Sequence, residues 1–137
     1  MKKHGEEFFV FGYILIFLFM TIGAFIWQFF MPHVADKYSL WNGSIGWQTE
    51  IALWNVGIDI GIIWTLWKRN IEYGKILVLI SFSLCILLGG HHLIYALSNS
   101  TGNKTLHWLG AIEVLGIGGI TGIIAIIKGK ILKNEKE

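Results

Sequence analysis

The stretch FFVFGYILIFLFMTIGAFIWQFFM, residues 8–31, decides the fold class of this chain because it carries no charged residue. A helix rises about 1.5 Å per residue, so a run of this length crosses about 30 Å of hydrocarbon. Three further apolar runs have similar lengths, at residues 45–67, 76–97 and 106–127. None alternates as a membrane strand would, and lipid otherwise admits only helices. The sequence therefore predicts an all-α fold, a four-transmembrane-helix bundle.

The composition agrees with a membrane protein and excludes a nucleic-acid-binding one. The chain has 137 residues, of which 54% are hydrophobic and 15% charged, against about 25% charged residues in soluble domains. This length predicts a single membrane domain over residues 1–137. The net charge of +2 forms no basic stripe, so the expected partner is the lipid bilayer and not nucleic acid.

The distribution of positive charge predicts the orientation. Nine of the eleven Lys and Arg residues lie on one side of a four-pass arrangement, and only Lys37 and Lys104 lie on the other. Because positive loops stay inside, we expect both termini in the cytoplasm (N-in/C-in) and a multi-pass protein of the bacterial cytoplasmic membrane. Tryptophans at the predicted interfaces agree, with the outer belt formed by Trp27, Trp41, Trp47 and Trp108 and the inner one by Trp64 and Trp67.

Four ionisable residues fall at one depth in the predicted outer leaflet. Counted at about 1.5 Å per residue from the outer end of each run, Glu50, His91, His92 and Glu113 lie about 8–10 Å deep. Each such residue costs about 2.5–3.5 kcal/mol on insertion scales, so a shared layer favours a functional cluster. We expect His92 rather than His91 to face inward. His107, at the outer start of the fourth run, is interpreted as an interfacial residue.

At helical spacing, the polar residues fall on particular faces of the predicted helices. The second run carries one stripe of Glu50, Trp54, Gly57, Gly61 and Trp64, with Gly57 and Gly61 suited to a close helix contact. On its opposite side lies a polar stripe of Gln48, Asn55 and Asp59, which indicates either a central helix or a homo-oligomer contact. Asp59 is expected either to be neutral and bonded to a neighbour such as Asn55 or Gln28, or to be in contact with water. In the fourth run the α-helical stripe is Gly110, Glu113, Ile117 and Thr121.

The layer supports three hypotheses, and the residues alone do not decide whether the chain is an enzyme. The first is a metal or haem site, which includes the case of a redox centre. Its ligands would be Glu50, His92 and Glu113, with His91 as a further candidate. The second is a proton-coupled carrier or binding protein for a small solute that acts as a dimer, with Glu50 and Glu113 as coupling groups. The third is a non-catalytic membrane assembly subunit.

The strings Gly46-Trp47-Gln48-Thr49-Glu50, Asn55-Val56-Gly57 and Gly90-His91-His92 carry a resemblance. They resemble a family of small four-helix bacterial membrane proteins of unknown function, over residues from about 44 to 121. The resemblance singles out Gln48, Glu50, Asn55, Gly57, His91 and His92. It implies no activity.

Overall fold

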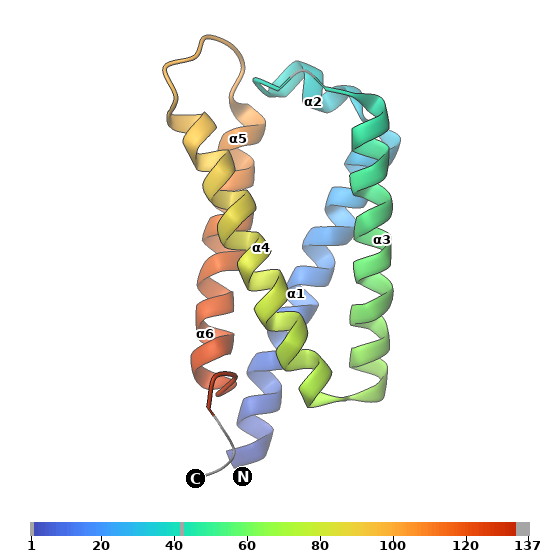
Figure 1. Cartoon of the computed structure of the whole chain (residues 1–137), viewed down its shortest axis with the longest axis vertical. Coiled ribbons are helices and arrows are strands. Elements are labelled where there is room, and N and C mark those ends of the chain that lie inside the picture. Colours follow the sequence, from blue (N-terminus) through green and yellow to red (C-terminus); the bar gives the residue numbers. More distant parts are fainter. Residues whose placement is uncertain (1, 42, 134–137) are drawn as a thin grey trace.

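The computed structural model describes residues 2–41 and 43–133, and this part of the chain is helical without any strand (Figure 1). Three long α-helices are α1 (Lys2–Phe30), α3 (Ile45–Lys68) and α4 (Ile71–Leu97), and α2 (His33–Tyr38) is short. The fourth long helix is continuous and has three parts, α5 (Thr105–Gly110), the π-helical η1 (Ala111–Gly119) and α6 (Ile120–Lys128). The predicted all-α class with four long helices is confirmed.

Each of the four is long and apolar enough to cross a membrane, with mean hydropathies of 2.5, 1.2, 2.1 and 2.0 in chain order. Their surfaces carry many exposed large apolar side chains, among them Phe19, Leu87, Ile94 and Ile112. Such a surface is unusual for a soluble domain.

The helix α4 begins at Ile71, earlier than the predicted residue 76, because the connection before it is a tight turn. Arg69 ends α3 in the left-handed conformation (φ 48°). Asn70 then caps α4, since its side-chain oxygen accepts the N–H groups of Glu72 and Tyr73 at 3.0 and 3.1 Å. The Asn70 cap satisfies amides of the first turn that have no partner within the helix. Residues 71–75, which precede the predicted start of this helix, therefore belong to it.

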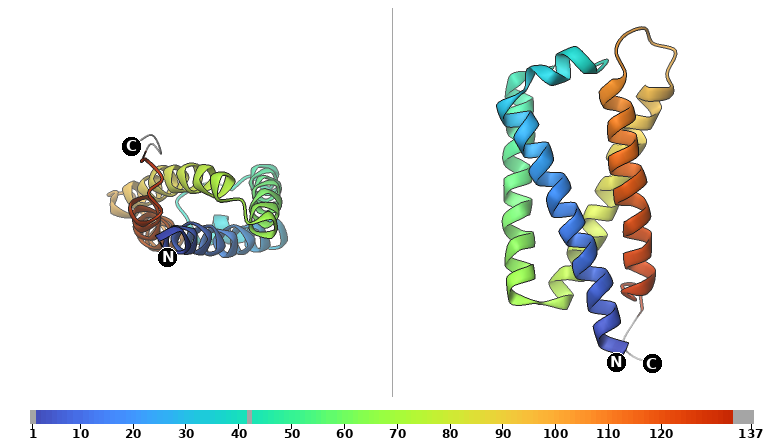
Figure 2. Two further views of the ribbon diagram at one scale, coloured as in Figure 1. Left: turned by 90° about the horizontal axis from the view of Figure 1, so that it is seen from below. Right: turned by 180° about the vertical axis from the view of Figure 1, so that it is seen from behind.

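The four long helices form two pairs that meet at one end of the molecule. Helix α3 packs mainly on α1, and the continuous α5–η1–α6 helix packs mainly on α4, while α1 also contacts α4 and α6 (Figures 1 and 2). Both termini lie at one end, called here the termini end, and α2 lies at the other, the α2 end. The buried core joins the pairs through side chains that include Val10, Ile14, Phe17, Ile62, Val78 and Cys85.

Glycines bring α4 and the fourth helix into close contact. A Cβ atom on Gly89 would lie 2.5 Å from the Leu115 backbone nitrogen, and one on Gly118 would lie 2.5 Å from the Cys85 sulfur. A Cβ on Gly57 or Gly61 would meet nothing within 4 Å. The prediction of a close helix contact at Gly57 and Gly61 is therefore wrong within this chain. These two glycines instead line an apolar groove of about 220 Å³ between α1, α3 and α4.

Candidate functional site

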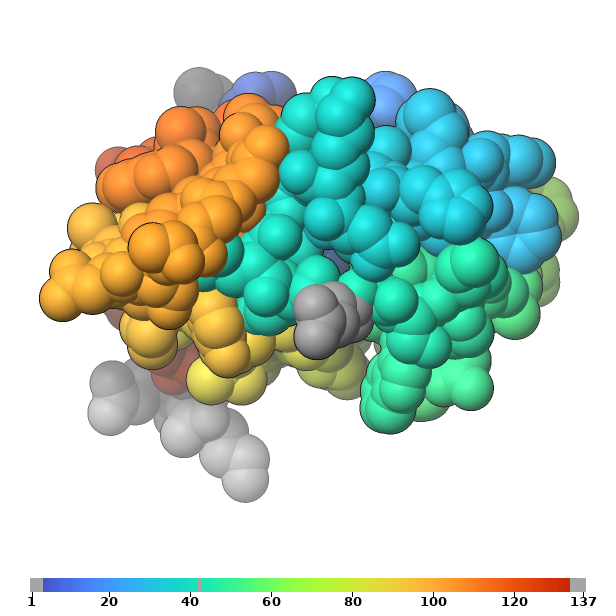
Figure 3. Space-filling view, turned by 90° about the horizontal axis from the view of Figure 1, so that it is seen from above, coloured from blue at the N-terminus to red at the C-terminus, as the bar shows by residue number. Residues whose placement is uncertain are grey.

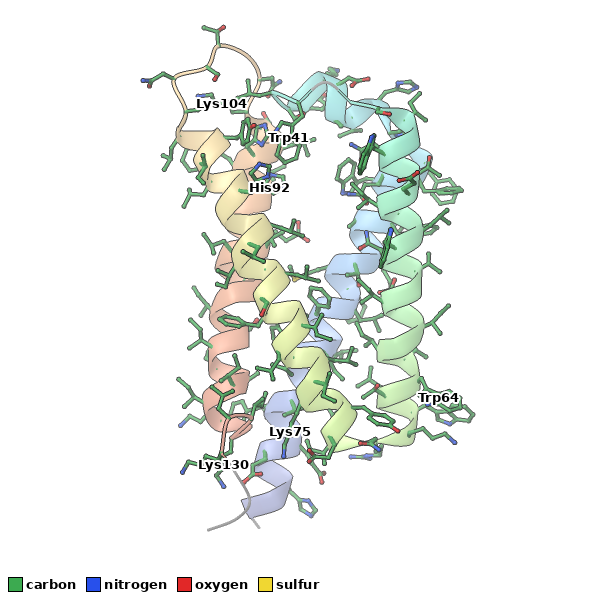
Figure 4. The ribbon with its side chains drawn as sticks, viewed as in Figure 1. Trp41, Trp64, Lys75, His92, Lys104 and Lys130 are labelled. Atoms are coloured by element: carbon green, nitrogen blue, oxygen red, sulfur yellow. The ribbon has the colours of Figure 1, made fainter. Side chains whose placement is uncertain are left out.

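Five aromatic and imidazole rings meet at the α2 end, and together they are called the histidine cluster: Trp41, His91, His92, Tyr95 and His107. Trp41 lies at the centre, with its ring centroid 5.2 Å from that of His91, 4.9 Å from His92 and 4.6 Å from His107. Figure 4 shows Trp41 beside His92, below the loop that carries Lys104. The rings come from three segments far apart in sequence.

The short strap Ser39–Trp41 brings Trp41 into the cluster. The Ser39 hydroxyl donates to the carbonyl oxygen of Ala35 at 2.7 Å, and its oxygen accepts the N–H of Trp41 at 3.1 Å. These bonds end α2 and turn the chain back over the bundle. In Figure 3, α2 and the residues after it cover the centre of this face, between α5 and the adjoining ends of α1 and α3.

His107 holds the strap. Its side chain is completely buried, and its Nε2 accepts the backbone N–H of Leu40 at 3.0 Å. A nitrogen that accepts a hydrogen bond carries no proton, so the neutral ring has its proton on Nδ1. That Nδ1 is buried and has no hydrogen-bond partner in the described part of the chain. His107 is therefore both the anchor of the strap and an incompletely satisfied polar group.

His92 is the second incompletely satisfied imidazole. Its ring lies flat against Gly110, where a Cβ atom would be only 2.6 Å from His92 Cγ. Its Nδ1 is buried and also lacks a partner among the described residues. The rings of His92 and His107 are 5.6 Å apart between centroids. His91, one residue earlier, is exposed and stacks on Trp41.

The structure brings only part of the predicted layer together. Glu50 is exposed on α3 and Glu113 is exposed on η1, and neither joins the rings of the histidine cluster. No three His, Cys, Asp or Glu side chains in residues 2–41 and 43–133 are placed to hold a metal ion. The expected convergence of Glu50, His92 and Glu113 as a ligand set is therefore not found. A shared depth does not bring residues together when α3 pairs with α1 and not with the fourth helix.

Two residues of the histidine cluster were given other roles by the sequence analysis. His107 and Trp41 were interpreted as interfacial residues, yet they form its centre. The available signal was that each lies toward the C-terminal end of a polar connection, and that these two connections share one end of the bundle. Hydropathy places both near an interface but does not show that the loops fold toward each other.

The polar stripe of α3 faces α1 of the same chain. The Thr21 hydroxyl lies 2.5 Å from Asp59 Oδ1, and Asn55 donates to the side-chain oxygen of Gln28 at 3.2 Å. The expected partners of Asp59 were Asn55 or Gln28, so that expectation is corrected to Thr21. Gln48 lies on the same stripe, and its side-chain oxygen is buried without a partner among the described residues. The exposed side of α3 is instead the stripe of Glu50, Trp54, Gly57 and Gly61.

No family model matches the chain, and neither the comparison with curated proteins nor that with solved structures found a match. The resemblance to the small four-helix bacterial proteins stays a prediction.

Proposed function

We propose that this chain is an integral protein of the bacterial cytoplasmic membrane that binds a small anionic solute together with protons at the histidine cluster. The four apolar helices support the membrane location. The proposed orientation puts the termini end in the cytoplasm and the α2 end outside. It is supported by the positive side chains, since Lys37 and Lys104 belong to the α2 end and the opposite end carries Lys68, Arg69, Lys75, Lys128 and Lys130.

The hydrogen bond from the Leu40 N–H to His107 Nε2 carries this proposal. Protonation of His107 turns both ring nitrogens into donors, so Nε2 can no longer accept the Leu40 N–H. The buried imidazolium would also repel protonated His91 and His92. Acid therefore favours release of the strap, which uncovers three cationic rings with N–H groups that suit a small anion. No carboxylate of the described residues hydrogen bonds to these rings, and Lys104 adds positive charge nearby.

Acidification is expected to change the fluorescence of Trp41 when His107 becomes protonated, because the Leu40 N–H then loses its acceptor and the strap is released. The signal of Trp41 is obtained as the difference between the wild-type protein and Trp41→Phe in detergent. His107→Gln is expected to remove the transition, because an amide oxygen accepts the Leu40 N–H at every pH. The matched control is His33→Gln, which changes an exposed histidine of α2 and should keep the transition.

Solute binding is tested with acetate and phosphate as probes, followed by the same signal. Saturable binding is expected at acid pH and should be lost in His92→Ala and kept in His33→Gln. A transition that persists unchanged in His107→Gln would contradict the strap mechanism. Failure of both anions to bind at any pH would contradict the solute proposal and favour the assembly subunit.

A metal centre is the second candidate, because the imidazoles of His92 and His107 each have a buried nitrogen without a partner among the described residues. Imidazole suits zinc, iron and copper, and Trp41 would have to leave for a metal to reach both rings. Elemental analysis and an absorption spectrum of the purified protein test this. A stoichiometric metal or haem band that is lost in His92→Ala and His107→Ala, but kept in Glu50→Gln, would replace the solute proposal.

Self-association through α3 is also proposed. The exposed stripe of Glu50, Trp54, Gly57 and Gly61 supports it, because a glycine pair lets helices approach closely and a carboxyl group exposed to lipid is costly. A cross-link between position 54 of one copy and position 54 of another should form only when both Gly57 and Gly61 are present. Gly57→Leu should therefore abolish it.

A further inference from the structure

Of the acidic side chains of α3, Asp59 lies further from the α2 end. The groups around it indicate whether its carboxyl group carries a proton. It is about 21 Å from the α2 end of that helix at the usual rise per residue, and only 8% of it is exposed. Its single hydrogen-bonding side chain is Thr21 of α1, and it has no cationic partner in residues 2–41 and 43–133. An unpaired carboxylate in such a place is costly.

The hydrogen bonds around Thr21 indicate a protonated acid. The Thr21 oxygen lies 2.9 Å from the carbonyl oxygen of Phe17, 3.0 Å from that of Leu18 and 2.5 Å from Asp59 Oδ1. A hydroxyl group has one proton, so it cannot donate to a backbone carbonyl and to a carboxylate at once. All contacts are satisfied when Asp59 carries a proton and donates to the Thr21 oxygen, while Thr21 donates to the backbone.

Polar side chains continue from Asp59 toward the α2 end. One turn along α3, Asn55 bonds to Gln28 of α1 at 3.2 Å. Two turns further, the side-chain oxygen of Gln48 is buried and lacks a partner among the described residues, so it is free to accept a hydrogen bond. Beyond Gln48 the first turn of α3 is exposed.

In the opposite direction the side chains are mainly apolar, and two of them, Ile14 and Ile62, also line the apolar groove described above. Ile62, Ile14 and Val78 are at most 1% exposed and form the core between Asp59 and the termini end. Thr65 lies nearer the termini end of α3, but its hydroxyl donates to the carbonyl oxygen of Gly61 in its own helix. The titratable core side chains Tyr13 of α1 and Cys85 of α4 contact each other at 3.9 Å, and neither bonds to Asp59.

We propose that Asp59 is a reversible proton-binding site that exchanges with the outer side alone, along Asn55, Gln28 and Gln48. On release, the Asp59 O–H bond breaks and its proton passes to water. Thr21 then turns its hydroxyl proton from the Phe17 carbonyl to the new carboxylate, so the same residue serves both states. This site rests on the proposed membrane orientation, but it does not depend on the histidine cluster.

The test is infrared spectroscopy of the complete chain in lipid vesicles. At neutral pH we expect the C=O stretching band of a protonated carboxyl group, absent in Asp59→Asn, which keeps a donor to Thr21. The band should shift when the sample is transferred to heavy water and fade at alkaline pH. Glu50→Gln and Glu113→Gln control for the exposed carboxyl groups and should leave this band in place.

The route is tested by the rate of that shift after the vesicles are transferred to heavy water. Asn55→Leu should slow it about tenfold, the effect of about 1.4 kcal/mol, and the matched variant Thr65→Val should leave it unchanged. A missing band, or one that never exchanges, would overturn the site, and equal slowing in both variants would overturn the one-sided route. His107→Gln should keep the band, so failure of the histidine proposal is distinguishable.

Discussion

Replacement of Gly89 by alanine is expected to lower the free energy of unfolding by about 3 kcal/mol, near the upper end for overpacked cores. The added Cβ would lie 2.5 Å from the backbone nitrogen and 2.8 Å from the Cα of Leu115. Backbone atoms in the middle of a helix cannot turn aside as the end of a side chain can. Helices α4 and η1 would have to separate along their whole contact. Thermal unfolding in detergent, followed by circular dichroism, measures the loss.

The neighbouring glycine provides the control. Gly90 lies one residue along α4, and a Cβ there would meet nothing within 4 Å. Gly90→Ala should be neutral or stabilise by up to about 1 kcal/mol, because alanine is the better helix former. Equal destabilisation by the two substitutions would contradict the close contact of α4 with η1.

Gly110→Ala is expected to have the largest effect on the histidine cluster. Its Cβ would lie 2.6–2.8 Å from Cγ, Nδ1 and Cδ2 of His92, so the ring must move. These atoms belong to a rigid ring whose centroid is 4.9 Å from that of Trp41, so its movement changes the contact with Trp41. We expect a cost of about 1–3 kcal/mol and a Trp41 signal that already resembles the acid form at neutral pH.

Gly116→Ala is the matched control within η1, since the nearest atom to its Cβ would be the Ala111 carbonyl oxygen at an ordinary 3.8 Å. This variant should keep the normal fluorescence and its acid transition. A Gly110→Ala protein with unaltered Trp41 fluorescence would show that His92 and Trp41 are not packed together. The Trp41 fluorescence of both variants is obtained as the difference from the spectrum with Trp41→Phe.

The sequence predicted the helices well because length and hydropathy are properties of each segment alone. Segments 8–31 and 45–67 correspond to α1 and α3. The predicted start of α4 was too late because the charged residues Glu72 and Lys75 interrupt the apolar run. The true start depends on the cap formed by Asn70, which is a local hydrogen-bond arrangement. These two side chains pair across the first turn of the helix and remain compatible with it.

The candidate site was harder to predict, because it depends on which helices are neighbours. Counting residues gives depth, and Glu50 shares its depth with His92, yet depth does not tell how far apart two helices stand. The stripe through Glu113 and Ile117 also assumed an α-helical period. Since η1 is π-helical, the buried positions are Ala111, Gly118 and Gly119, while Glu113 and Ile117 are exposed. No motif in the sequence marked that change of period.

The π-helical stretch has a consequence for how this gene can change in length. In a π-helix each backbone N–H bonds to the carbonyl group five residues earlier and not four. The helix therefore contains more residues between His107 and Gly122, which both face α4, than a regular α-helix would. Loss of one codon there would yield a regular α-helix and leave both residues on that face. The same loss within α3 would rotate all later residues by about 100° and turn Asp59 away from Thr21. Natural length variants should therefore concentrate in residues 111–119.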